Sequence, residues 1–309
     1  MSAVPIGVDR LAGVAPVMMT PFDAAEEVDL ASFDRVLEHL LARDVPAIMF
    51  PGFASEFAKL APAEKTMLGI RLIEATRGTR TVPVLAVQAP ATRVALDEAR
   101  TWVDSGAQAV NLLPPRESGA PRSQVVAHCR ALLAALPETA VVLQHAPTAP
   151  GGLTAGDVRE LAAEHPNLVA VKVEARPPYR FIAELAEGDA PIPSLAGNGG
   201  LYLLESLRLG AVGVQPGSGF VEVYESIMSV WADGDEATAA GVFGRLVPYL
   251  LGWATTQDTM VAAEKRIAHR RGLISTPVCR RPGVVLSDTD AAAVDRFVEE
   301  FALVGEVAR

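Results

Sequence analysis

The chain has 309 residues, of which 50% are hydrophobic and 21% are charged, and its net charge is −10. This composition excludes a disordered chain or a fibre, and the negative charge disfavours nucleic acid or an anionic membrane as the main partner. No apolar run approaches the roughly 20 residues of a membrane-spanning helix, and the first residues lack the pattern of a secretory signal. Cys129 and Cys279 stand apart without metal-ligand spacing. We therefore expect a cytoplasmic protein in a reducing compartment.

Eight short apolar runs recur along the chain and predict strands. Each run is continuous rather than alternating, which is typical of strands buried on both faces of a parallel sheet. Helix signals lie between the runs: Asp29 or Ser32 as a cap, Pro62 as a first residue with Gly78 at the end, and Thr154 as another cap. The expected strands cover residues 14–19, 47–51, 82–87, 109–113, 140–144, 168–173, 192–196 and 212–216.

Eight strands that alternate with helices predict an α/β fold, namely a (β/α)₈ TIM barrel. A doubly wound open sheet is the rival, but the first strand runs into Met-Thr-Pro-Phe at residues 19–22, which is no glycine-rich phosphate loop. After the eighth strand the pattern indicates helices only. We therefore expect a barrel domain over residues 1–232 and a C-terminal helical extension over residues 233–309. In that extension Arg266, Arg270 and Arg271 are expected to face solvent or another subunit.

Lys172 is the polar residue that attracts most attention, because it lies inside the apolar run Leu-Val-Ala-Val-Lys-Val at 168–173. Burial disfavours the charged form of an amine, and a neutral amine attacks carbonyl carbon, so a lysine in a strand suits Schiff-base chemistry. The alternative is a lysine at the tip of a strand that reaches solvent or pairs with Glu174. Position alone leaves both interpretations open.

Other polar residues at strand ends carry weaker signals. His145 follows the fifth strand and could be a base, although a lone histidine there is more often an ordinary hydrogen-bonded residue. Glu56 could bind a metal or act as a base, but we favour a brace that holds its loop. The glycine-rich stretches at 197–200 and 217–219 could hold an anion or could simply be turns. No His-x-His or Glu-x-Asp spacing occurs, so we expect neither a metal-dependent aldolase nor a metal or other cofactor.

Five segments, in order and with matching spacing, resemble the dihydrodipicolinate synthase/N-acetylneuraminate lyase family of class I aldolases. The resemblance covers nearly the whole chain and implies a Schiff-base role for Lys172, a small carbonyl substrate and a homo-oligomer, either a tetramer built from dimers or a dimer. The segments are MTPF (19–22), PGFASEFAKLAPAEK (51–65), AVKVEA (170–175), LAGNGGLYLLESLRLGAVGV (195–214) and RGLISTPVCRRP (271–282).

The chain departs from that family at several functional positions. The family's proton-transfer tyrosine falls on Gln144, and an amide cannot exchange a proton near neutral pH as a phenol can. The resemblance thus implies that the usual proton shuttle is missing and that the synthase of lysine biosynthesis is a poor assignment. The paired threonines fall on Phe53 and Ala54, the tyrosine lent by a neighbouring subunit falls near Pro115 or Arg116, and the arginine that marks the synthase falls on Ala149.

We therefore expect a lyase, of the aldolase or dehydratase type, that forms an imine between Lys172 and a 2-oxo acid. Gln144 would position substrate or water, and His145 is a possible replacement base. Neighbouring strand residues point to opposite sides, so only one of these two should enter the barrel. The substrate carboxylate is expected to be held by Ser55, Asn198 and the backbone amides around Gly52 and Gly197. The full set of groups expected to surround the substrate is Gly52, Phe53, Ala54, Ser55, Gly197, Asn198 and Gln215.

Two other functions remain open from the sequence. The lost tyrosine and threonines would also fit a catalytically silent relative that binds a metabolite or acts as an assembly partner. A barrel lyase that uses Glu56 or Glu174 without an imine is the third possibility.

Overall fold

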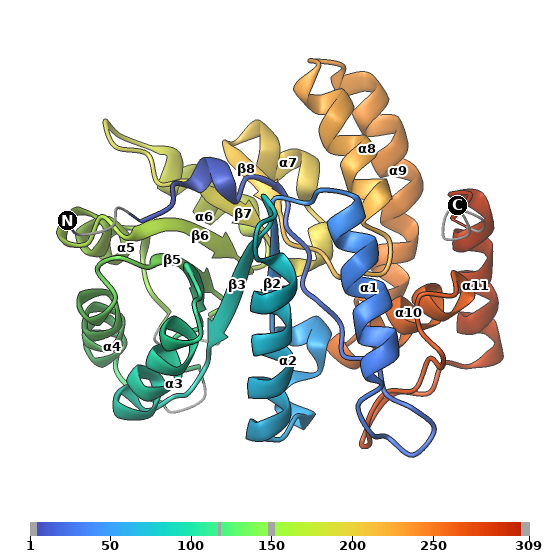
Figure 1. Ribbon diagram of the computed structural model, residues 1–309. Coiled ribbons are helices and arrows are strands. Elements are labelled where there is room, and N and C mark those ends of the chain that lie inside the picture. The colour runs from blue at the N-terminus through green and yellow to red at the C-terminus, as the bar shows by residue number, and fades with distance from the viewer. Residues whose placement is uncertain (1–4, 117–118, 148–151, 304–309) are drawn as a thin grey trace.

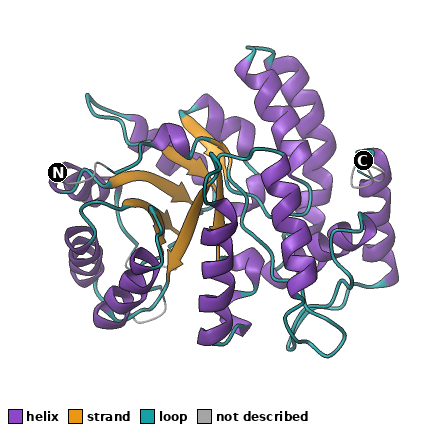
Figure 2. Ribbon diagram, viewed as in Figure 1, coloured by secondary structure: helices purple, strands orange, loops and turns teal. Residues whose placement is uncertain are grey.

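The computed structural model describes residues 5–116, 119–147 and 152–303. Within these residues, eight strands form one parallel sheet in the order β1-β8-β7-β6-β5-β4-β3-β2. The strands occupy the centre of the molecule and helices surround them (Figures 1 and 2). The bounds are β1 Gly13–Val14, β2 Ala47–Phe50, β3 Val82–Val87, β4 Ala109–Leu112, β5 Ala140–His145, β6 Leu168–Val173, β7 Ser194–Ala196 and β8 Ala211–Val214.

The sheet closes into a barrel just after β1. Val17 forms parallel bridges to both Met49 and Gly217, so the chain that follows β1 joins β2 to the segment beyond β8. The predicted TIM barrel is therefore confirmed, because a closed ring of eight parallel strands with intervening helices defines that fold.

The first strand is shorter than the sequence predicted. Continuous pairing ends at Val14 instead of residue 19, because Pro16 has no N–H group to donate to the ladder. The chain nevertheless stays extended, since the N–H of Ala15 bonds Val214 O at 2.9 Å and that of Met18 bonds Met49 O at 2.9 Å. The other strands begin and end within two residues of their predicted bounds.

Side chains alternate between the barrel interior and the helical layer along each strand. Val142 on β5 and Ala170 on β6 belong to a small interior cluster, whereas Leu143 and Val171 belong to the core beneath the helices. Two residues further along, the interior positions hold polar side chains. This alternation decides which residues of β5 and β6 can reach a substrate inside the barrel.

The barrel helices begin where their caps predict. Asp29 accepts a hydrogen bond from the N–H of Ser32, Pro62 is the first residue of its helix, and Thr154 accepts from the N–H of Asp157. The barrel helices are α1 Leu30–Ala42, α2 Pro62–Thr76, α3 Thr92–Asp104, α4 Arg122–Ala135, α5 Ala155–Glu164, α6 Pro178–Ala186, α7 Leu203–Arg208 and α8 Val221–Ala232; short 3₁₀ turns are η1 Val8–Arg10, η2 Phe53–Ser55, η3 Phe57–Lys59 and η4 Asn198–Gly200.

Three helices follow the barrel: α9 Glu236–Trp253, α10 Gln257–Arg270 and α11 Asp288–Glu300. They share one continuous hydrophobic core with the outer face of the barrel. Helix α10 also contacts η2, the turn that follows β2, so it reaches the carboxyl end of the strands. The expected boundary at residues 232–233 coincides with the end of α8 and stays a prediction of domain organisation.

One expectation for the C-terminal helices is wrong. Arg271 is buried rather than solvated: its Nη1 lies 3.0 Å from Glu222 Oε2 and donates to Gly219 O at 2.6 Å. The end of α10 packs against α8, which provides the carboxylate that a buried guanidinium requires. Arg266 and Arg270 instead pair with Asp295 of α11.

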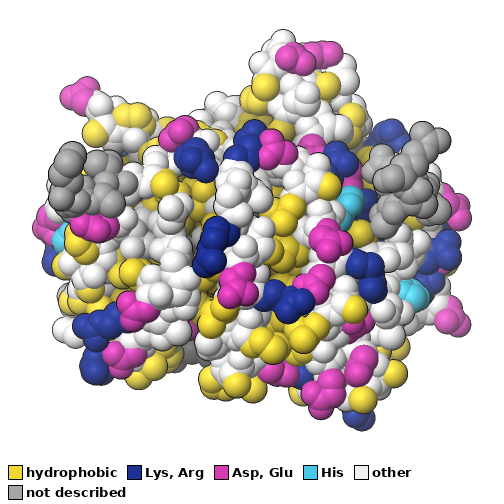
Figure 3. All heavy atoms as spheres, in the orientation of Figure 1, with side chains coloured by type: hydrophobic (Ala, Val, Ile, Leu, Met, Phe, Trp, Pro, Cys, Tyr) yellow, Lys and Arg dark blue, Asp and Glu magenta, His cyan; other side chains and the backbone are white. Residues whose placement is uncertain are grey.

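The surface is of mixed charge on the face drawn in Figure 3, where basic and acidic side chains lie interspersed among apolar ones. Among the described residues, no helix is both long and apolar enough to cross a lipid bilayer.

Candidate active site

A cavity of about 590 Å³ opens at the carboxyl end of the strands, which is where TIM-barrel enzymes bind their substrates. Its volume suits a small organic molecule. The wall is built from the segments after seven of the eight strands, all except β3, and from α10. Residues that line it include Val17, Phe53, Ala54, Arg116, Lys172, Glu174, Arg176, Asn198, Gln215, Gly217 and Glu264.

Lys172 projects from β6 into this cavity. Its side chain is 2% exposed, and its Nζ lies 3.2 Å from Glu174 Oε1 and 4.0 Å from Met49 Sδ. The ion pair with Glu174, one of the two alternatives that the sequence left open, is therefore present. The amine nevertheless lines a cavity with room for a guest molecule, so the pair does not close it off.

Glu174 is held in place by a chain of hydrogen bonds across three strands. Gln144 Nε2 donates to Glu174 Oε2 at 2.6 Å, and Asn111 Nδ2 donates to Gln144 Oε1 at 2.7 Å. Asn111 on β4, Gln144 on β5 and Lys172 on β6 are all buried. Gln144 thus fixes the carboxylate that meets the amine. Sequence reasoning missed Asn111, although a polar residue inside a buried strand is a readable signal.

Gly197 makes room for Glu174. A Cβ at Gly197 would collide with Glu174 Cγ and come within 2.8 Å of Val173 O. Its N–H group, which we expected to hold a substrate carboxylate, already bonds Val173 O at 2.9 Å. The role of Gly197 is therefore to leave space for the side chain of Glu174.

His145 points away from the cavity. Its ring stacks on Phe181 of α6 with a centroid distance of 3.7 Å, and its Nε2 lies 3.0 Å from Leu153 O. Burial lowers the pKa of the imidazole to about 4, so the ring is neutral at physiological pH. Strand alternation admits Gln144 to the barrel interior and turns His145 to the helical layer, so the structure does not bring His145 together with Lys172.

The turn after β2 contributes backbone and apolar groups rather than a hydroxyl. Phe53 and Ala54 line the cavity, but Ser55 does not, because its Oγ donates to Met18 O and accepts from the N–H of Gly52 at 2.9 Å. Ser55 is fully buried in this role. Ser55 and the N–H of Gly52 thus already have hydrogen-bond partners within the protein, so they do not provide the expected contacts to a substrate carboxylate.

Glu56 acts as the brace that the sequence favoured. Its Oε1 accepts from Lys265 Nζ of α10, and its Oε2 accepts from Lys59 Nζ at 3.0 Å and from the N–H of Arg280 at 3.1 Å. Burial is the largest influence on Lys265 and lowers the pKa of its ammonium, while Glu56 opposes that change. This buried cluster ties the turn after β2 to the C-terminal helices.

Asn198 and Gln215 both line the cavity. Asn198 Nδ2 donates to Ala175 O at 3.1 Å, and its Oδ1 accepts from Arg176 Nε at 3.3 Å. Gln215 differs, because its Oε1 is buried and has no hydrogen-bond partner within residues 5–116, 119–147 and 152–303. Arg116 covers the ring of Phe53 at 5.1 Å and donates to Ala146 O at 2.9 Å, which places a guanidinium at the mouth. Ala149 lies outside the described residues.

Glu264 of α10 is a cavity residue that sequence reasoning missed. The side chain is buried, and burial alone raises the pKa of its carboxyl group to about 8. A glutamate in a helix rich in basic residues is typical of the protein surface. The sequence therefore gives little indication that Glu264 lines the cavity.

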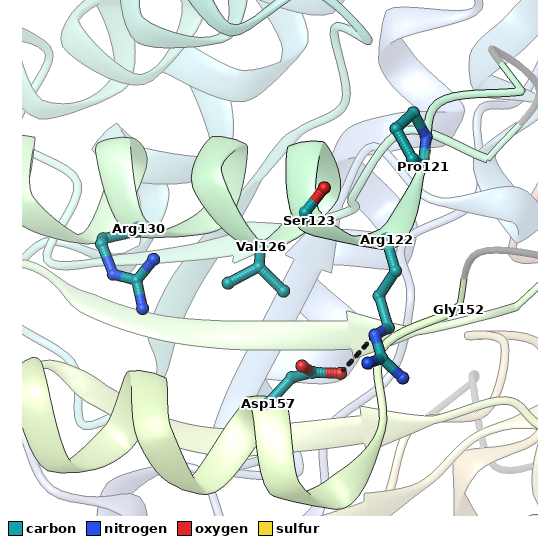
Figure 4. Close-up of a pocket in the computed structure, with 7 residues that line it drawn as sticks. All are labelled: Pro121, Arg122, Ser123, Val126, Arg130, Gly152 and Asp157. Atoms are coloured by element: carbon teal, nitrogen blue, oxygen red, sulfur yellow. Dashed lines mark ion pairs between the residues drawn. The ribbon is translucent and has the colours of Figure 1, made fainter.

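A second hollow lies on the outer surface between α4 and α5 (Figure 4). Arg122 and Asp157 point toward one another across it at 3.6 Å, and Arg130 pairs with Glu160 and Glu164. Ordinary surface ion pairs thus account for its charge. Nowhere in the described part of the chain do three or more His, Cys, Asp or Glu side chains gather closely enough to hold a metal ion.

Residues 10–301 match the model of the dihydrodipicolinate synthetase family. The chain belongs to this family. The resemblance read from the five segments is therefore confirmed.

Relatives in the family differ in their named activities. A 4-hydroxy-tetrahydrodipicolinate synthase of Exiguobacterium sibiricum is 29% identical over 174 residues, which span 56% of this chain and 58% of that protein's length. An L-2-keto-3-deoxyarabonate dehydratase of Azospirillum brasilense is 25% identical over 280 residues, or 88% of this chain and 89% of that one. A prophage protein of the same family from Escherichia coli K12, solved in complex with pyruvate, superimposes with a TM-score of 0.83 over 94% of this chain and 99% of that chain at 19% identity.

Proposed function

We propose that this protein is a class I lyase in which Lys172 forms an imine with a 2-oxo acid. The observation that carries the proposal is the buried amine of Lys172 in the wall of a cavity, 3.2 Å from the carboxylate of Glu174. The relatives named as a synthase and a dehydratase, and the related protein solved with pyruvate, support a 2-oxo acid as the substrate class.

Imine formation moves two protons from the lysine nitrogen to the departing oxygen. Glu174 can carry the first: its carboxylate takes a proton from the Lys172 ammonium, and the free amine then attacks the C2 carbonyl carbon. The second proton passes from the attacking nitrogen to the new alkoxide oxygen and gives the carbinolamine. The Glu174 carboxylic acid then returns its proton to the hydroxyl of the carbinolamine, which leaves as water and gives the protonated imine. Gln144 lacks a group that exchanges protons, so in this scheme it is a positioning residue for Glu174.

The imine then serves as an electron sink for the chemical step. When the C3–H bond or the C3–C4 bond breaks, its electron pair moves toward the imine nitrogen and yields an enamine. A C3 proton would pass to the Glu174 carboxylate, which is already free after imine formation. When the C3–C4 bond breaks instead, C4 leaves as an aldehyde and its hydroxyl proton passes to the same carboxylate. Aldol cleavage, condensation and dehydration all follow from this intermediate, and the substrate decides among them.

The acid group of the substrate requires donors or a cation near Lys172. The N–H groups of Phe53 and Ala54 begin the turn η2, where no intrahelical partner is available to them, and both residues line the cavity. Arg176 lies in the same wall and supplies a positive charge. We assign these groups to the carboxylate. The missing threonines, tyrosine and synthase arginine argue against the synthase of lysine biosynthesis.

A catalytically silent relative is the second candidate, because Lys172 is already paired with Glu174 and the family's tyrosine is replaced by Gln144. Borohydride reduction in the presence of pyruvate separates the two functions. An imine-forming enzyme gains the mass of the reduced adduct on Lys172, as located by peptide mapping, whereas a silent binder gains none.

Three variants sharpen this experiment. Lys172→Ala should give no adduct, and Lys65→Arg, which alters a lysine outside the cavity, should give the full adduct. Glu174→Gln keeps the shape of the side chain but cannot accept a proton, so the rate of adduct formation should fall by roughly 10²–10⁴-fold. Absence of an adduct with pyruvate and with longer 2-oxo acids would overturn the proposal, and lyase activity that survives Lys172→Ala would favour chemistry without an imine.

A further inference from the structure

Glu264 is a buried carboxyl group that the imine chemistry above does not use. It lines the same cavity as Lys172, is 3% exposed, and its Oε2 is buried with no hydrogen-bond partner in the parts of the chain that the structure describes. An unpaired polar group in such a place costs folding free energy. A bound molecule that satisfies the group would offset this cost.

The side chain reaches the cavity because Gly217 leaves space for it. A Cβ at Gly217 would overlap both carboxyl oxygens of Glu264, so the carboxyl group rests directly on the backbone beyond β8. Gln215 lies two residues earlier on the same extended segment and therefore faces the same side. Glu264 and Gln215 thus form one polar region of the wall, which we call the β8 subsite.

The two members of the β8 subsite have complementary hydrogen-bonding capacity. Burial raises the pKa of Glu264 to about 8, so at pH 7 it is a neutral acid with an O–H group to donate. Gln215 Oε1 is an acceptor, and it too is buried without a partner in the described ranges. A free donor and a free acceptor in the same wall match a hydroxyl group, which accepts one hydrogen bond and donates another.

We propose that the β8 subsite binds a hydroxyl group on the chain of the substrate, so that Glu264 and Gln215 select a hydroxylated 2-oxo acid over its deoxy analogue. The inference rests on the proposed imine at Lys172, which anchors the other end of the same molecule. Rejection of the deoxy analogue follows from the physics of buried polar groups: without the hydroxyl, both partners stay unpaired in the complex.

The test compares matched 2-oxo acids by borohydride trapping. For the wild-type protein we measure the concentration that gives half-maximal adduct with 2-oxopentanoate, 4-hydroxy-2-oxopentanoate and 5-hydroxy-2-oxopentanoate. We expect at least one hydroxylated acid to require about tenfold less than 2-oxopentanoate, in line with the discrimination that a satisfied hydroxyl provides. Equal concentrations for all three acids would overturn the β8 subsite while leaving the imine intact. No adduct with any acid would overturn the proposed function itself.

Variants of Glu264 assign the preference to this residue. Glu264→Leu should bring the ratio of the half-maximal concentrations close to one, whereas Glu264→Gln should keep the preference because an amide also donates. Asp258→Asn changes a carboxylate of the same helix that faces Lys59 rather than the cavity, and the ratio should not change. An undiminished preference in Glu264→Leu would overturn the assignment, and Glu264→Gln keeps it testable if the leucine variant fails to fold.

The pH dependence of the ratio of half-maximal concentrations tests whether the Glu264 carboxyl group is protonated. As pH rises from 7 to 9, Glu264 ionises and loses its donor, so the preference should decline in the wild type and persist in Glu264→Gln. Among the described residues, the ionisable groups around Glu264 are Tyr224 of α8 and, in the same cavity wall, Lys172, Glu174, Arg116 and Arg176. Their effects on imine formation act on all three acids and cancel in the ratio. Identical pH profiles for the two proteins would contradict a donating Glu264.

Discussion

Glu174 reaches Lys172 only because residue 197 has no side chain. The same carboxylate takes a hydrogen bond from Gln144, so its position is determined by an amide on one side and by the bare backbone of Gly197 on the other. A glycine that looks like a turn residue in the sequence therefore controls the geometry of the candidate proton-transfer group.

Replacement of Gly197 by alanine should displace Glu174 from the amine. We expect adduct formation on Lys172 to slow by at least tenfold, because a misplaced catalytic group loses most of its effect. The stability cost of the added methyl should be about 1–3 kcal/mol. Both are measurable, by borohydride trapping over time and by urea denaturation.

Gly241 supplies the matched control for this substitution. It lies in α9, and a Cβ there meets nothing within 4 Å. Gly241→Ala should leave adduct formation unchanged and raise helix stability by roughly 0.5–1 kcal/mol. Normal trapping rates in Gly197→Ala would show that Glu174 is not the proton carrier.

At the scale of elements, a buried ion pair joins the turn after β2 to the C-terminal helix α10. Glu56, in the turn after β2, meets Lys265 of α10, and both side chains are nearly inaccessible to solvent. The same turn carries Phe53 and Ala54 of the cavity wall, and the same helix carries Glu264. The ion pair therefore fixes the position of two walls of the cavity relative to each other.

Lys265→Met should destabilise the protein by about 3–5 kcal/mol, because it leaves the Glu56 carboxylate buried without its main partner. Arg80→Met removes an exposed pair with Asp44 and should cost no more than about 1 kcal/mol. The urea midpoint at unchanged m-value measures both. A double variant, Glu56→Leu with Lys265→Met, should recover part of the stability that Lys265→Met loses. Equal losses of stability in Lys265→Met and Arg80→Met would contradict the importance of the buried pair.

For the whole molecule, a half-buried and a buried carboxyl group, Glu222 and Glu264, give stability opposite dependences on pH. Glu222 of α8 lies between His39 and Arg271, which overcome its burial and lower its pKa to about 2. Its contribution is present above the unfolded value near 4.5 and is lost as the pH falls toward 2. Glu264 has a raised pKa, so the folded state keeps a proton that the unfolded chain releases, and stability falls between pH 4.5 and 8.

Glu264→Gln should therefore gain stability relative to the wild type as pH rises from 5 to 8, with a slope of at most about 1.4 kcal/mol per pH unit. Glu222→Gln should be less stable than the wild type at pH 7, and this difference should shrink toward pH 2. Urea unfolding across pH 2–9 gives both profiles. Curves that run parallel to the wild type for either variant would refute the corresponding assignment.

The sequence by itself determined the barrel and the strand that carries Lys172. Runs such as 82–87 and 168–173 are apolar throughout, and local continuity of this kind is enough to predict buried strands to the residue. Strand parity likewise separated Gln144 from His145. The predicted first strand is too long, because a pattern of apolar residues carries no information about the missing N–H group of Pro16.

Only the tertiary structure decided what surrounds the amine. Glu174 is two residues from Lys172 in the chain, but the Asn111–Gln144 pair that holds it and the carboxyl group of Glu264 come from other strands and from α10. Their meeting depends on how the barrel closes and where α10 packs. Burial, pairing and the charge of a carboxyl group are properties of that packing. Hydrophobic periodicity describes one element at a time, so it predicts the scaffold and leaves the chemistry of the cavity to the fold.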